Sequence, residues 1–154
     1  MSTTLRTAAS VGGSAAIIGA SLLFDGSVAQ AAPFDGTDPI ATGCSNTARV
    51  ARQADLVNGV TGAHHGTVQL YYSSACRTVW AKVITDEPGC QPGIDFCGDA
   101  VVHRLSDGAE LRCITPAGSS SCYTRQLNDA NVTSLAAATA DSGPYTYFGK
   151  TAAF

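Results

Sequence analysis

Among the residues of this 154-residue chain, the three histidines are the most suited to catalysis. His103 has Asp99 and Asp107 nearby, and Ser73 and Ser74 precede a cysteine, so a Ser-His-Asp hydrolase is conceivable. The two serines are not in a nucleophile elbow or another recognisable catalytic setting. We therefore predict no catalytic residues and expect that the protein is not an enzyme.

His64 and His65 form a second candidate, for metal binding or catalysis. Neighbouring residues of an extended chain point to opposite sides, and this pair lies between Gly62 and Gly66 in a pattern typical of a turn. An exposed loop is therefore favoured over a site.

Four acidic residues, Asp95, Asp99, Asp107 and Glu110, could flank a sugar or a calcium ion. They lack the regular spacing of oxygen ligands in a calcium loop, so a solvated face is the better interpretation. We predict no metal and no cofactor.

The first 31 residues have the three-part layout of an export signal. Arg6 is the sole charge of the amino-terminal part, and residues 11–24 form an apolar run too short to span a bilayer comfortably. Residues 29–31 read Ala-Gln-Ala, which supplies the small side chains that a signal peptidase requires. We predict cleavage after Ala31 and a secreted, extracellular protein.

All six cysteines follow this cleavage site, and an even number in an exported chain indicates three disulfides. No Cys-x-x-Cys pair is present, so a structural zinc site is disfavoured. Six cysteines allow fifteen pairings. The favoured set is sequential: Cys44 with Cys76, Cys90 with Cys97, and Cys113 with Cys122.

The last of these bridges has the most support from the residues themselves. Cys113 and Cys122 lie in two short runs joined by residues 115–120, which contain proline, glycine and serine. This pattern predicts a hairpin that brings the two cysteines opposite each other.

Residues 32–154 have the length of one domain with one modest core. Removal of the signal takes away one basic and one acidic residue, so the net charge stays at −3. The charges are scattered. They provide neither a basic stripe for nucleic acid nor a polybasic patch for a membrane.

The clearest structural pattern lies in residues 67–85. Val68, Leu70 and Tyr72 alternate with polar or aromatic neighbours, which is the period of a half-buried strand. A second alternating run begins at Arg77, after a serine turn. Trp80 is expected at the edge of the core, packed beside Tyr72.

Other segments add shorter strands, over residues 46–56, 100–105, 110–114 and 121–126. Residues 86–98 contain two Pro-Gly pairs and are expected to form a loop. Six to eight short strands without a clear amphipathic helix predict an all-β domain over residues 44–154, a small disulfide-stabilised sandwich or barrel.

Residues 32–43 lack periodicity and are interpreted as a flexible, extended amino-terminal arm with little reason to pack on its own domain. We predict that its first five residues form a peptide that docks into a partner, with one large apolar anchor. These residues are Ala32, Pro33, Phe34, Asp35 and Gly36. A tail left by signal cleavage is the alternative.

Several motifs resemble those of the YjfA-like family of small exported proteins, found mainly in actinobacteria. They are Asp38-Pro39, Gly43-Cys44, the run LYYSSACRTVWAKV at residues 70–83, and residues 128–134. The resemblance covers most of residues 32–154. It implies a bridge between Cys44 and Cys76 and carries over no catalytic residue.

The resemblance further implies a role as the small adaptor subunit of umbrella-shaped antibacterial toxin particles. The expected partners are a large repeat-containing toxin subunit and lectin-bearing subunits with a degenerate trypsin-like domain. From the residues alone, a secreted protease inhibitor presenting a loop such as residues 88–97 remains an alternative, and so does a small secreted hydrolase.

Overall fold

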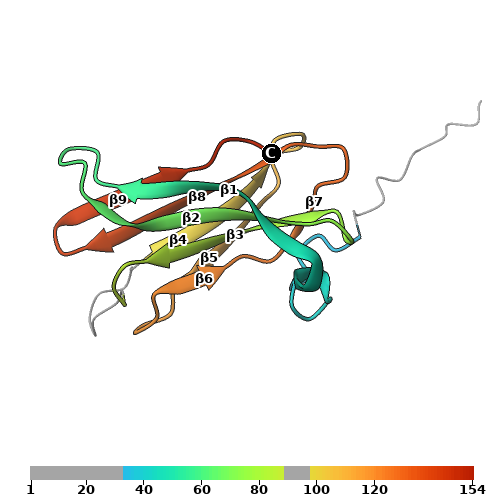
Figure 1. Ribbon diagram of the computed structural model, residues 1–154, viewed down its shortest axis with the longest axis horizontal. Coiled ribbons are helices and arrows are strands. Elements are labelled where there is room, and N and C mark those ends of the chain that lie inside the picture. The colour runs from blue at the N-terminus through green and yellow to red at the C-terminus, as the bar shows by residue number, and fades with distance from the viewer. Residues whose placement is uncertain (1–32, 89–97) are drawn as a thin grey trace, which may run out of the picture. The chain divides into compact units, whose positions relative to one another are not determined.

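The computed structural model describes residues 33–88 and 98–154, which form an all-β domain (Figure 1). The predicted signal at residues 1–31, Ala32 and the predicted Cys90–Cys97 bridge lie outside these residues. In the described part, one 3-10 turn, Cys44–Thr47, precedes nine strands. They are β1 (Ala48–Val57), β2 (His64–Ser73), β3 (Thr78–Thr85), β4 (Gly98–Arg104), β5 (Glu110–Ile114), β6 (Ser121–Tyr123), β7 (Leu127–Asn128), β8 (Ser134–Ser142) and β9 (Tyr145–Lys150).

The strand pair expected over residues 67–85 is the antiparallel hairpin β2–β3. Alternation assigns Val68 and Leu70 to one side of β2 and Val79, Ala81 and Val83 to one side of β3, and all five are fully buried. The predicted faces are therefore correct, because burial of one side of a sheet fixes the register of its strands.

All pairings in the described sheet are antiparallel, in the order β5-β4-β8-β9-β1-β2-β3-β6, with β7 also beside β3. The sheet curls into a nearly closed barrel of eight strands, so the all-β prediction is confirmed and its barrel alternative is the correct one. β9 meets β1 at a single ladder position, Val57 opposite Phe148. The strand predicted over residues 46–56 is β1.

β5 and β6 are the two ends of this strand order, and no ladder joins them within the described residues. A disulfide between Cys113 on β5 and Cys122 on β6 spans the seam instead, with 6.0 Å between their Cα atoms. The predicted bridge is confirmed. The predicted hairpin is wrong in one respect, because β6 pairs with β3 rather than with β5.

Small side chains let the walls of the barrel approach each other. Ala136, Ala138 and Ala140 occupy alternate positions of β8, are buried, and share one core cluster with larger residues of β2 and β3. β8 and β9 form a hairpin through a turn at Gly143, whose φ of 59° suits glycine. Among the described residues, no helix has the length and apolar character needed to cross a membrane.

Candidate functional site

The predicted docking peptide is divided in the structure between an exposed part and an anchored part. Ala32 lies outside the described residues, and Pro33 and Phe34 are exposed. Asp35 and Gly36 are hydrogen-bonded to the β domain. The expectation that the segment has little reason to pack on its own domain is therefore wrong from Asp35 onward.

Asp35 is held by a nearly buried arginine at the end of β4. Its carboxylate accepts a hydrogen bond from Nη1 of Arg104 at 3.0 Å and one from the backbone N–H of Asn128 at 2.5 Å. Arg104 also donates to both carboxylate oxygens of Asp107, at 2.9 and 2.7 Å. The pKa of Arg104 is raised, chiefly by its hydrogen bonds to Asp107, against the opposing effect of burial. One buried cation thus binds two carboxylates.

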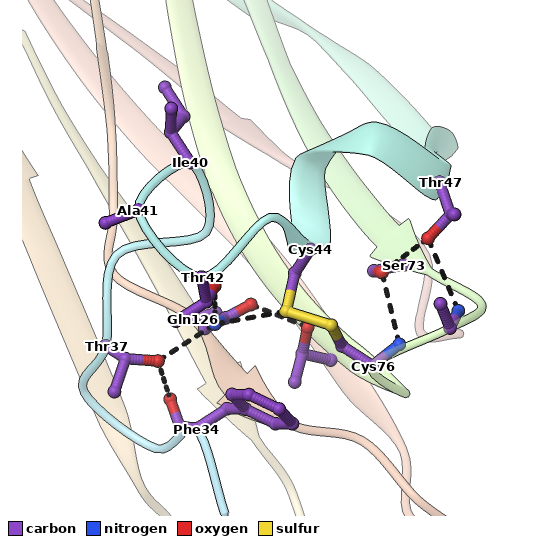
Figure 2. The surroundings of a disulfide bond; sticks show 12 residues. Phe34, Thr37, Ile40, Ala41, Thr42, Cys44, Thr47, Ser73, Cys76 and Gln126 are labelled. Atoms are coloured by element: carbon purple, nitrogen blue, oxygen red, sulfur yellow. Dashed lines mark hydrogen bonds between the residues drawn. A yellow bond between two sulfur atoms is a disulfide. The ribbon is translucent and has the colours of Figure 1, made fainter.

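A second anchor, Gln126, holds the next two residues of the segment, Gly36 and Thr37 (Figure 2). The backbone N–H of Gly36 donates to the carbonyl of Gln126, and the N–H of Gln126 donates to the carbonyl of Thr37, both at 3.0 Å. The side-chain amide of Gln126 donates to Thr37 Oγ1 and Thr42 Oγ1, both at 2.9 Å. Its carbonyl oxygen accepts from Thr78 at 2.7 Å, so this fully buried amide joins the segment to β3.

The predicted bridge between Cys44 and Cys76 closes the same region, as Figure 2 shows. It ties the 3-10 turn at the end of the segment to the β2–β3 connection, with 5.6 Å between the Cα atoms. Thr47 and Ser73 are hydrogen-bonded beside it at 2.9 Å. Residues 35–47 are therefore held at both ends.

Phe34 begins the fixed turn and is the exposed apolar residue of the predicted peptide. Its carbonyl accepts hydrogen bonds from the N–H and the hydroxyl of Thr37, at 3.0 and 2.7 Å. Its φ is 80°, a left-handed conformation that is costly for an aromatic residue. The side chain remains 36% exposed. The turn thus presents an aromatic ring at a defined place.

The anchored segment also covers the outer side of β3. A shallow groove of about 270 Å³ lies there, between Pro39 and Ile40 of the segment and Tyr71, Trp80 and Tyr123 of the barrel. Trp80 is only 5% exposed and stacks on Tyr71, with ring centroids 5.6 Å apart. The predicted contact with Tyr72 is wrong, because the register places Tyr71 opposite Trp80.

The histidines occupy three unrelated positions. His64 Nδ1 lies 2.9 Å from the carboxylate of Asp86 at the exposed end of β2. His65, expected in an exposed loop, is instead 9% exposed and stacks on Tyr147 at 4.7 Å. His103 Nδ1 lies 2.7 Å from Glu110, its neighbour across the β4–β5 ladder.

The Ser-His-Asp arrangement considered above is not assembled. Ser73 is buried and bonded to Thr47, while His103 has Glu110 as its partner. Asp99 is 4% exposed, bonded to Thr139 and ion-paired with Arg112, so the solvated-face interpretation is wrong for this residue. Across residues 33–88 and 98–154, no group of three or more histidine, cysteine or acidic residues could hold a metal ion.

Sequence reasoning missed Arg104 and Gln126, the two residues that anchor the segment. Their partners lie 69 and 89 residues away in the chain, so no local period links them. The available signal was an arginine at a strand end with an aspartate three residues later, a pattern too common to identify a contact.

The fold and its bridges define a small antiparallel barrel, and its two disulfides in the described residues indicate an extracytoplasmic protein. Residues 32–138 match the family described as "Protein of unknown function (DUF2690)", and the chain belongs to that family. It is also 30% identical over 123 residues to "Uncharacterized protein YjfA" of Bacillus subtilis (strain 168), with 75% of this chain and 76% of that protein covered. The relationship to YjfA is thus confirmed. No solved structure matches the chain.

Proposed function

We propose that the protein is a secreted, non-enzymatic adaptor that joins protein partners through its exposed amino-terminal residues. The partners are those of an antibacterial toxin particle: a large repeat-containing toxin subunit and lectin-bearing subunits with a degenerate trypsin-like domain. The observation that carries the proposal is Phe34, an exposed aromatic residue at the start of a segment anchored by Arg104 and Gln126.

The anchored turn that carries Phe34 favours docking for an energetic reason. A peptide that is ordered only on binding loses conformational entropy at that moment, whereas a turn held by the hydrogen bonds of Asp35 and Gly36 has already lost it. Less of the favourable binding energy of the aromatic ring is then lost to ordering the peptide. A trypsin-like groove accepts an extended peptide without any catalytic step.

The structure changes how the docking residues must be tested. Deletion of residues 32–36 would remove the carboxylate of Asp35 from Arg104 and lower the melting temperature. Deletion of residues 32–34 leaves both anchors in place. The informative variants are therefore this shorter deletion and Phe34→Ala, with Ile40→Ala as the matched control, because Ile40 is an exposed apolar residue of the same segment.

Affinity purification of the tagged protein from its own culture supernatant identifies the partners. We expect a very large toxin chain and lectin-bearing proteins in the eluate. We expect Phe34→Ala to weaken binding of the lectin-bearing partner at least tenfold, with an unchanged melting temperature, and Ile40→Ala to bind normally. Full binding by the deletion variant would contradict the docking role. Recovery of the protein alone would contradict the adaptor role.

A further inference from the structure

The outward side of β4, β8 and β9 carries an apolar patch, although the solvent-facing side of an antiparallel sheet is normally polar. The ladders align Val101, Ala137 and Lys150 in one row across the three strands, and His103 and Leu135 in the next. The residues between them along each strand face the barrel interior. A second apolar surface therefore lies outside the core.

This surface is hollowed into a groove of about 380 Å³, which we call the β4–β9 groove. Val101, Leu135 and Ala137 are half-buried within it, and Leu105 and Phe148 line it with 48% and 52% of their surfaces exposed. A concave apolar surface with large exposed side chains is suited to receive an apolar side chain of another protein.

The two charged side chains of the groove, Glu110 and Lys150, differ in whether they have a local partner. Glu110 is on β5, and its carboxylate lies 2.7 Å from Nδ1 of His103, within hydrogen-bond distance, so it already has a local partner. Lys150 is on β9, three strands away from Glu110 in the sheet order, and is exposed. Lys150 forms no ion pair with any residue of the described parts of the chain. Lys150 is therefore the charged side chain of the groove that is left for a ligand.

We propose that the β4–β9 groove binds an extended segment of a protein partner that carries a large apolar side chain and, two residues later, a carboxylate. Residues two apart on an extended chain point to the same side and lie about 7 Å apart. The apolar side chain then contacts Val101 and Ala137, and the carboxylate reaches Lys150. The inference rests on the adaptor function proposed above, since it assigns that adaptor a second contact surface.

The test uses the purified protein and short synthetic peptides. The probe is acetyl-Gly-Phe-Ser-Asp-Gly-amide, and the comparison peptides replace its Phe by Ala or its Asp by Lys. Backbone amide shifts measured by NMR during titration report both affinity and location. We expect saturable shifts in β4, β8 and β9 with the probe, and at least fivefold weaker binding of each comparison peptide.

A charge-reversal variant distinguishes specific binding in the groove from nonspecific association. Lys150→Glu should reverse the preference, so that the lysine peptide binds better than the aspartate peptide. Lys82→Glu is the matched control, because Lys82 is the chain's other lysine and lies on β3, outside the groove. This control should bind the probe normally.

Absence of saturable shifts, shifts confined to other strands, or a preference unaffected by Lys150→Glu would each overturn the proposal. These results are independent of the amino-terminal segment, because the peptides and the substitution involve none of residues 32–34. If the protein needs Phe34 to bind its partner but its groove binds no peptide, the adaptor function stands and only the proposed second surface is overturned.

Discussion

Arg104 is the side chain on which the amino-terminal segment most depends. It is 9% exposed and lies between the carboxylates of Asp35 and Asp107. A buried guanidinium requires such partners, because removing a charge from water is costly unless hydrogen bonds replace the lost hydration. Two acidic residues from different parts of the chain thus stabilise one cation, and the segment is fixed as a result.

Asp107 should make the stability of the protein depend on acid pH. Its pKa is lowered from 3.8 to about 2, first by the hydrogen bond from Arg104. Because the lowered pKa belongs to the folded state, this contribution is present above about pH 4 and is lost as the pH falls through about 2. Urea unfolding between pH 2 and pH 5 should show the loss.

One variant supplies the control for that experiment. Asp107→Asn should remove this part of the pH dependence. Asp129 is expected to act in the opposite direction, since burial raises its pKa, so its contribution is lost as the pH rises through the raised value. A pH profile unchanged by Asp107→Asn would contradict the assignment.

Trp80→Ala should destabilise the protein by about 3 kcal/mol or more, because the indole is buried and stacked on Tyr71. The free energy of unfolding in urea measures the loss. Lys82→Ala, two residues along the same side of β3, should change stability by less than about 0.5 kcal/mol, because Lys82 is partly exposed to solvent. Native fluorescence of Trp80 should resist quenching by iodide, and full quenching would argue against burial.

The β5–β6 seam shows how strands can be neighbours without a ladder. Within residues 33–88 and 98–154, each of these two strands pairs on one side only, β5 with β4 and β6 with β3. The Cys113–Cys122 bridge joins them, and the bridged cysteines are only nine residues apart in sequence. The seam is therefore the place where we expect the barrel to open first.

A double variant that carries both Cys113→Ser and Cys122→Ser tests that expectation. A disulfide that closes a loop of this length contributes about 3 kcal/mol in the chain-entropy model. We expect a loss of that order, together with faster amide hydrogen exchange in β5 and β6 than in β2. Exchange that rises uniformly over all strands would contradict a local role for the bridge.

The contact between β9 and β1 should also be sensitive to a single methyl group. A Cβ at Gly149 would lie 2.6 Å from the carbonyl oxygen of Asp55, which is closer than real Cβ atoms come. Gly149→Ala is therefore expected to cost about 1 to 3 kcal/mol in unfolding free energy. Gly59→Ala is the control, since a Cβ there meets nothing within 4 Å, and it should not destabilise the protein. Equal stability of the two variants would contradict the close approach.

The barrel as a whole is held by bonds that link distant parts of the chain. The bridge between Cys44 and Cys76 spans 32 residues and secures the anchored segment, while the seam bridge closes the sheet. A domain of this size has a small margin of stability, so two such bonds matter for it. They also make its folding depend on an oxidising compartment.

We therefore predict that the protein isolated from culture medium contains no free thiol. Mass spectrometry after alkylation without reduction counts the thiols, and peptide mapping assigns the bridges. Four cysteines are paired in the structure, and Cys90 with Cys97 is the remaining predicted pair. Two or more alkylated cysteines would contradict both the pairing and the export signal.

The sequence by itself determined the class of fold and much of its local detail. The alternation of Val68 and Leu70, and of Val79 and Val83, indicated the strands and their buried sides, because a period of two is a local property of an extended chain. The Cys113–Cys122 bridge was likewise predictable, since its two short runs are close in sequence.

Only the tertiary structure decided which distant residues meet. His65 stacks on Tyr147, Trp80 on Tyr71 rather than Tyr72, and Asp35 bonds to Arg104. The two ring contacts depend on ladder register or on barrel closure, and a shift of one residue in register exchanges the two sides of a strand. The ion pair depends on how the amino-terminal segment folds back onto the end of β4. Such pairings are set by packing over the whole sheet, which leaves no periodic signal in the chain.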